Sequence, residues 1–119
     1  MTLRGLITIV DTSTDDNYSW HMTEIIKTNI FDRWFDTLRD VRAKAKVTAR
    51  IRRLGLGNPG DVKPIGEGLS EMRIDYGQGY RVYYMTKGPI IIVLLCGGDK
   101  GTQARDIEQA KTIAAQWKD

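Results

Sequence analysis

The chain is poor in the residues that form covalent cross-links and metal sites. Its 119 residues include one cysteine, Cys96, and one histidine, His21. A disulfide framework needs several cysteines, and a zinc site needs clustered cysteine and histidine ligands. Serine and cysteine hydrolases need a base near the nucleophile, in motifs that this chain lacks. We therefore expect no disulfide, no metal and no hydrolytic triad, and we interpret Cys96 as a small buried hydrophobe.

Long apolar runs are also absent. The longest extends from Pro89 to Cys96, far short of the roughly 20 apolar residues that span a bilayer. The apolar stretch before Asp11 is too short for a secretory signal. These features predict a cytoplasmic protein without a membrane-spanning helix. The length allows one hydrophobic core, and we expect one main domain.

The first 21 residues differ in composition from the rest. Residues 6–10 can form a short strand, whereas residues 11–17 are polar and turn-prone. Acidic residues predominate there, although the whole chain has a net charge of +3. We interpret residues 1–21 as an N-terminal extension of uncertain order and residues 22–119 as the main domain.

Apolar periodicity predicts an α+β fold for that domain. A strand is expected at 24–27 and helical spacing at 31–54, with a break near Asp40 that fits either two helices or one kinked helix. Four strands follow, at 62–65, 69–76, 80–86 and 90–96. Their short spacers require antiparallel neighbours. A last helix after Thr102 completes a sandwich of helices against a mostly antiparallel sheet.

Residues 71–84 are expected to form a hairpin that separates apolar from charged side chains. A loop at 77–79 would pair Tyr76 with Tyr80, because strand side chains alternate between two faces. The apolar face would then contain Met72, Ile74, Tyr76, Tyr80, Val82 and Tyr84. The opposite face would contain Glu71, Arg73, Asp75, Arg81, Tyr83 and Met85.

Basic residues suggest two places for an anion. The stretch 39–53 is rich in arginine and lysine, which suits a polyanion or an acidic partner but also an ordinary solvated helix face. The loop 97–102 precedes a helix N-terminus, where free amides favour an anion, but it lacks the glycine spacing of a nucleotide-binding loop. Arginines on the hairpin could join Lys63 and Lys100 in one phosphate site, or form a cross-strand ion pair.

Three blocks resemble the addiction-module killer branch of the RelE/ParE toxin superfamily, often called HigB-like. They are F-D-R-W-F-D-T-L-R-D at 31–40, R-I-R-R-L-G-L-G-N-P-G-D-V-K-P-I-G-E-G-L-S-E-M-R-I-D-Y-G-Q-G-Y-R-V-Y-Y at 50–84 and L-L-C-G-G-D-K-G-T-Q-A-R-D-I at 94–107. The resemblance covers about residues 22–117. It implies a small α+β microbial RNase sandwich and a toxin that arrests growth.

The same resemblance implies an activity and partners. RelE-like toxins cleave mRNA in the ribosomal A site, by attack of a ribose 2′-hydroxyl on the adjacent phosphate without a metal. The implied protein is a metal-independent endoribonuclease without a cofactor. Its partners would be the ribosome, mRNA and a cognate antitoxin, of helix-turn-helix type and encoded nearby, in a toxin–antitoxin hetero-oligomer.

Roles for single residues also follow from the resemblance. Arg73 and Lys100 would stabilise the transition state, Arg81 would position the substrate, and Lys63 would contact phosphate or transfer a proton. The substrate-binding candidates are Tyr83, Gln103, Asp106, Arg50 and Arg53. The last helix lacks the tyrosine or histidine of many cleaving toxins, so proton transfer would fall to Lys63, Tyr83 or Asp106.

Two other functions are compatible with the same fold. A ParE-like toxin would bind and poison DNA gyrase without cutting RNA, since one fold supports different targets. A non-catalytic nucleic-acid-binding module would use the basic helix for affinity alone.

Overall fold

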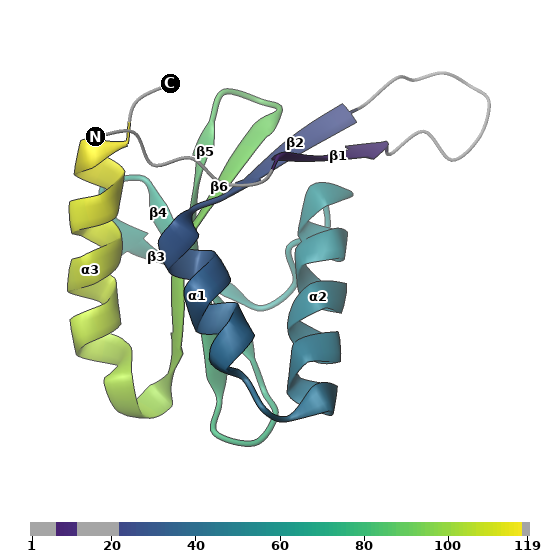
Figure 1. Cartoon of the computed structure of the whole chain (residues 1–119). Helices are drawn as coiled ribbons and strands as arrows, with labels where there is room; N and C mark the ends of the chain where they lie inside the picture. The colour runs from purple at the N-terminus through teal and green to yellow at the C-terminus, as the bar shows by residue number, and fades with distance from the viewer. Residues whose placement is uncertain (1–6, 12–21, 118–119) are drawn as a thin grey trace.

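The computed structural model describes residues 7–11 and 22–117, with side chains from Thr23 onward. Its elements are β1 (Ile7–Asp11), β2 (Met22–Lys27), α1 (Asn29–Thr37), α2 (Val41–Gly55), β3 (Val62–Gly66), β4 (Leu69–Ile74), β5 (Tyr80–Lys87), β6 (Ile91–Asp99) and α3 (Gln103–Gln116). A turn of 3-10 helix, η1 (Lys100–Thr102), joins β6 to α3. This order confirms the predicted α+β class (Figure 1).

The strands form one mixed sheet in the order β1-β2-β6-β5-β4-β3. The four strands expected after the helices are antiparallel neighbours, whereas β2 pairs with β6 in parallel. β6 is therefore an interior strand, as its unalternating apolar run predicts, and its central residues are buried. Within the described residues, no helix is long and apolar enough to cross a membrane.

Helices cover both faces of this sheet (Figure 1). Phe31 of α1 and Val47 of α2 share one core with Met72 and Val82, and Ile113 of α3 belongs to a second core. The predicted strand at 6–10 is observed as β1, paired with β2. The remainder of residues 1–21 lies outside the described residues, and the proposed domain division stays a prediction.

The helical region divides into two helices. Thr28 is the N-cap of α1: its hydroxyl accepts a hydrogen bond from the amide of Phe31 at 3.0 Å. Asp40 caps α2, because its carboxylate accepts from the amides of Arg42 and Ala43. Extended backbone before this cap ends the first helix.

The hairpin has a different register from the expected one. Tyr80 pairs with Ile74, so that Arg73 faces Arg81. The predicted pairing of Tyr76 with Tyr80 is wrong because Tyr76 belongs to the loop, where its amide donates to the carbonyl of Ile74 and its carbonyl accepts from Gly79. The shift is two residues, and therefore every strand side chain keeps the face that the sequence predicts.

Two glycines bring the helices close to the sheet. Gly97 lies under the ring of Trp34 from α1, and Gly98 lies under the carboxylate of Asp106 from α3. A Cβ atom at either position would fall within 3.0 Å of those side chains, which real Cβ atoms essentially never do. Consecutive strand residues point to opposite faces, so one glycine serves each layer of helices.

Candidate functional site

A shallow pocket of about 210 Å³ lies where β4, β5 and η1 meet. Its lining residues are Asp61, Arg73, Asp75, Gly79, Arg81 and Lys100. Three of the four residues predicted to act in catalysis, Arg73, Arg81 and Lys100, are thus brought together. The fourth, Lys63, is exposed on the edge strand β3 and does not line this pocket.

The strand register explains why these cations meet. Arg73 and Arg81 are directly opposite each other on β4 and β5, so their side chains share one face of the sheet. Lys100 follows β6 and reaches this face by lying across Gly79. Gly79 has φ of +77°, and a Cβ there would be 2.6 Å from Cδ of Lys100. Both the backbone and the space require glycine at this turn.

The charge of the pocket is mixed. The guanidinium of Arg73 contacts the carboxylate of Asp61 at 3.1 Å, in a pair that is open to solvent. Lys100 is exposed, whereas only 12% of the Arg81 side chain is accessible. Three cations therefore face two carboxylates, Asp61 and Asp75. Such a pocket suits a single phosphate, which guanidinium groups bind through paired hydrogen bonds.

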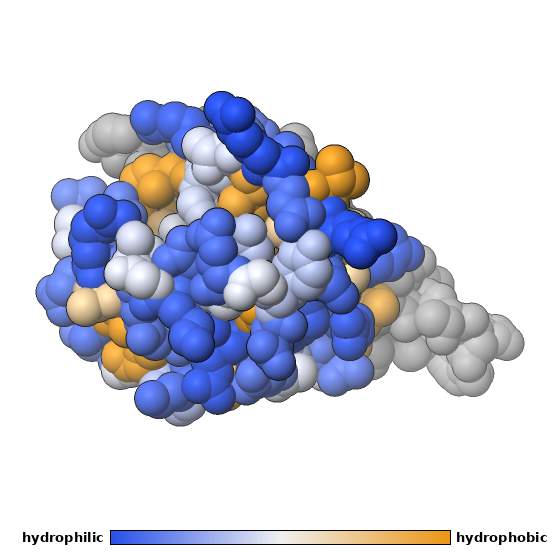
Figure 2. All heavy atoms as spheres, turned by 90° about the horizontal axis from the view of Figure 1, so that it is seen from below, coloured by the Kyte–Doolittle hydropathy of each residue, from blue (hydrophilic) through white to orange (hydrophobic). Residues whose placement is uncertain are grey.

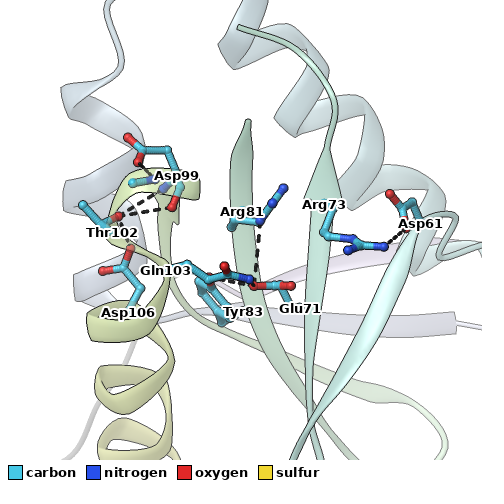
Figure 3. Close-up of polar contacts among 10 residues, drawn as sticks. Asp61, Glu71, Arg73, Arg81, Tyr83, Asp99, Thr102, Gln103 and Asp106 are labelled. Carbon is cyan, nitrogen blue, oxygen red and sulfur yellow. Dashed lines mark hydrogen bonds and ion pairs between the residues drawn. The ribbon is translucent and has the colours of Figure 1, made fainter. Parts of the chain in front are cut away.

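A buried carboxylate lies behind the arginines. Glu71 of β4 has no exposed surface, and Figure 3 shows three side chains directed toward it. Its Oε2 accepts hydrogen bonds from the Tyr83 hydroxyl at 3.0 Å and the Gln103 amide at 2.7 Å. The same oxygen lies 3.8 Å from Nε of Arg81. The sequence placed Glu71 on this face but did not indicate that it is buried.

The side chains of Tyr83 and Gln103, which were expected to contact a substrate, are directed to Glu71. Tyr83 is completely buried, and burial, with its bond to Glu71, raises the pKa of its hydroxyl far above the ordinary value. It remains a protonated donor to Glu71 and is remote from solvent. The side-chain amide of Gln103 is likewise directed to Glu71.

Asp106 is also buried rather than open to a substrate. Its Oδ2 accepts a short hydrogen bond from the hydroxyl of Thr102, which in turn accepts from the amide of Asp99 (Figure 3). Thr102 makes no side-chain cap to α3, because its hydroxyl serves η1. Asp106 thus fixes the turn that carries Lys100.

The two basic candidates on α2 have different surroundings. Arg50 donates to the backbone carbonyls of Arg73 at 2.6 Å, Pro59 at 3.0 Å and Asp61 at 3.2 Å. It therefore ties α2 to the segments that carry Arg73 and Asp61. Arg53 is exposed and, with Arg50, lines a separate hollow on the α2 side. Neither residue lines the pocket of Arg73 and Lys100.

A larger hollow of about 490 Å³ lies at the same end of the sheet, between the α1–α2 junction and the β4–β5 loop. Its lining residues include Trp34, Arg39, Gln78, Tyr80 and Asp99. Figure 2 looks at this end of the molecule and shows a predominantly hydrophilic surface with few apolar patches. The sequence pattern did not indicate this hollow.

Comparisons with known proteins identify the family. A protein from Haemophilus influenzae, described as an uncharacterized protein, is 53% identical over 96 residues, which are 80% of this chain and 97% of that protein. The comparison with solved structures gave no significant match. Residues 33–118 match the family model described as phage derived protein Gp49-like (DUF891). The chain therefore belongs to the Gp49-like family of phage-derived proteins.

Proposed function

We propose that the chain is a toxin of a toxin–antitoxin module and an endoribonuclease whose phosphate site is the pocket of Arg73, Arg81 and Lys100. The Gp49-like family is associated with RelE and toxin-like modules. The observation that carries the proposal is the meeting of two opposed arginines and a lysine in one pocket. The resemblance of residues 22–117 to RelE/ParE toxins supports the same conclusion.

The proposed reaction needs little covalent chemistry from the protein. The RNA 2′-hydroxyl attacks the adjacent phosphorus, the bond to the 5′-oxygen breaks, and the products are a 2′,3′-cyclic phosphate and a 5′-hydroxyl. A base takes the 2′ proton, and an acid supplies one to the leaving oxygen. Arg73 and Arg81 would bind the non-bridging oxygens, and Lys100 would neutralise the charge that develops. Asp61 and Asp75 are the carboxylates in the pocket that could accept the proton.

Alanine substitutions test the proposal directly. Removing one donor to a transition-state oxyanion commonly costs 10²- to 10³-fold in rate, and we expect losses on the order of 100-fold or more for Arg73→Ala and Lys100→Ala. Arg52→Ala is a matched control, since Arg52 is an exposed arginine on α2. Cleavage would be mapped by primer extension, with ribosomes and with free RNA. Unaltered cleavage by both pocket variants would disprove the assignment.

The partners follow from the same proposal. A cytoplasmic toxin of this class would act on mRNA at the ribosome and be inhibited by a cognate helix-turn-helix antitoxin in a hetero-oligomer. An acidic antitoxin segment would suit the basic surface of α2, where residues such as Arg52 and Arg53 are exposed. Co-purification of this chain with the product of the neighbouring open reading frame tests the interaction.

One observation favours a second candidate, a ParE-like gyrase poison. Lys63, Tyr83 and Asp106 were the expected proton-transfer groups, and none of them lines the pocket. A pocket that lacks these three expected groups also suits a protein that inhibits a partner by binding and not by cleavage. A supercoiling assay with purified gyrase separates the two functions, because an endoribonuclease leaves supercoiling unchanged. Salt-sensitive RNA binding without cleavage or toxicity would instead favour a binding module.

A further inference from the structure

Glu71 is a charged residue in an unusual place. It lies within β4 with no accessible surface, between the sheet and α3. A buried carboxylate is costly unless hydrogen bonds and an opposite charge compensate for its lost hydration. A sheet needs no carboxylate at such a position, since an apolar residue would pack there at lower cost. The burial of Glu71 therefore points to a role beyond packing.

The groups around Glu71 are all donors. Tyr83, Gln103 and Arg81 direct an O–H or N–H group toward Oε2, at 3.0, 2.7 and 3.8 Å respectively. Oε1 is buried and has no hydrogen-bond partner in the structure. Carboxylate oxygens accept hydrogen bonds, and the surrounding donors all converge on Oε2. The single cation in ionic contact with it is Arg81, among the residues that the structure describes.

The contact between Arg81 and Glu71 involves the Nε edge of the guanidinium. Nε of Arg81 faces Glu71 and makes no hydrogen bond of its own, while the residue also lines the phosphate pocket. A guanidinium carries five N–H groups in one plane. A carboxylate near Nε restrains that plane and leaves the terminal amino groups for a ligand. Figure 3 shows Nε of Arg81 toward Glu71 and the end of the guanidinium directed away from that carboxylate.

Glu71 also connects the two elements that carry the cations. Gln103 is the first residue of α3 and directly follows η1, where Lys100 lies. The hydrogen bond from its side-chain amide to Glu71 joins the start of α3 to the middle of β4. We expect the loss of this support to shift Arg81 and the Lys100 turn together. Misplacement of about 1 Å at a reacting centre can cost on the order of 100-fold in rate.

We propose that Glu71 is a positioning residue, which acts through Arg81 to orient its guanidinium in the phosphate pocket. This inference rests on the proposed endoribonuclease function and assigns Glu71, Tyr83 and Gln103 as one supporting network. Glu71 touches no substrate. Its replacement should therefore change the rate of cleavage only as far as Arg81 depends on it.

A double-mutant cycle tests this dependence. Single-turnover cleavage of an RNA oligonucleotide would be measured for the wild type, Glu71→Gln, Arg81→Lys and the double variant, at saturating and at low RNA. We expect each single variant to lose on the order of 10- to 100-fold in the saturated rate. The double variant should be no slower than Arg81→Lys alone, because residues that act as a unit are not additive. Independent, multiplying losses would overturn the proposal.

Two further measurements keep the result interpretable. Tyr83→Phe removes one donor to Glu71 and preserves the buried ring, and it should give a smaller loss of rate in the same direction, even if Glu71→Gln unfolds the protein. Glu67→Gln is the matched control, because Glu67 is an exposed glutamate paired with Lys111. Normal cleavage by Tyr83→Phe together with normal cleavage by Glu71→Gln would overturn the proposal.

The NMR signal of the Arg81 Nε–Hε group provides a readout that does not require RNA cleavage. In the wild type it should be shifted and slow to exchange with solvent, and Glu71→Gln should move it toward the position of exposed arginines. If the wild type cleaves no RNA, the proposed function fails, and this signal still decides whether Glu71 holds Arg81. An unchanged signal in Glu71→Gln refutes the positioning role.

Discussion

Substitution of Gly97 by alanine provides a sharp test of how α1 packs on the sheet. The added Cβ would meet three atoms of the Trp34 ring at less than 3.0 Å, whereas ordinary contact is 3.4–4 Å. The ring must therefore withdraw by about 1 Å before ordinary contact is restored. Gly97 does not have a positive φ, so the cost of alanine there comes from the contact with the ring and not from the backbone conformation. Overpacking of this kind typically costs about 1–3 kcal/mol.

Urea unfolding measures this cost. With a slope of about 2 kcal/mol per M, a loss of about 2 kcal/mol lowers the midpoint by about 1 M. Gly101→Ala is the control, since its Cβ would approach only Oδ1 of Asp99, at 3.2 Å in exposed surroundings. Trp34→Ala and the double variant complete a cycle. The reasoning is refuted if Gly97→Ala destabilises the Trp34→Ala protein as much as it destabilises the wild type.

Further predictions concern stability, reactivity and pH. Arg50→Ala removes side-chain donors to three backbone carbonyls and should lower the unfolding free energy by about 2 kcal/mol in urea titration, whereas Arg52→Ala should have almost no effect. Burial raises the pKa of the Cys96 thiol to about 12 from 9.0, so a thiol reagent at pH 8 should label it only after unfolding. The same thiol keeps its proton in the folded state and loses it above pH 9 when unfolded. The contribution of the thiol to the free energy of unfolding is therefore complete below pH 9 and is lost as pH rises toward 12. Between pH 8 and 10 the free energy of unfolding should fall by about 1.4 kcal/mol on this account. Cys96→Ala should remove that part of the decline, and an unchanged decline would show that other groups cause it.

The sequence predicts the faces of the sheet better than its pairing. Alternation placed Met72 and Val82 in one core, and hydrophobic continuity identified β6 as interior. The register of the hairpin was missed because loop hydrogen bonds to Ile74 and Gly79 remove Tyr76 from the strand. Side-chain alternation is insensitive to a shift of two residues. The parallel pairing of β2 with β6 also lacks a local signal, because it joins segments far apart in the chain.

The candidate site was predictable in its cations and not in its support. Charge and resemblance selected Arg73, Arg81 and Lys100, and their meeting follows from the strand order. Glu71, Tyr83 and Asp106 read as polar residues near a site, yet all three are buried. Burial depends on how α3 covers the sheet, and side-chain type alone does not encode it. The structural role of Arg50 was also missed. Its partners are backbone carbonyls, and side-chain type does not reveal such contacts.

The position of β6 has a consequence for folding during synthesis. β2 pairs with β6, and the hydroxyl of Thr28 donates to the carbonyl of Leu95, 67 residues later. The strands from β3 to β6 can form from local hairpins, but β2 and α1 have no central strand to pack against until residues 91–99 have left the ribosome. Non-local pairing of this kind is slow to form. A nascent chain that stops before β6 therefore lacks both the inner strand and the turn with Lys100, and incomplete copies would lack the pocket of Arg73, Arg81 and Lys100.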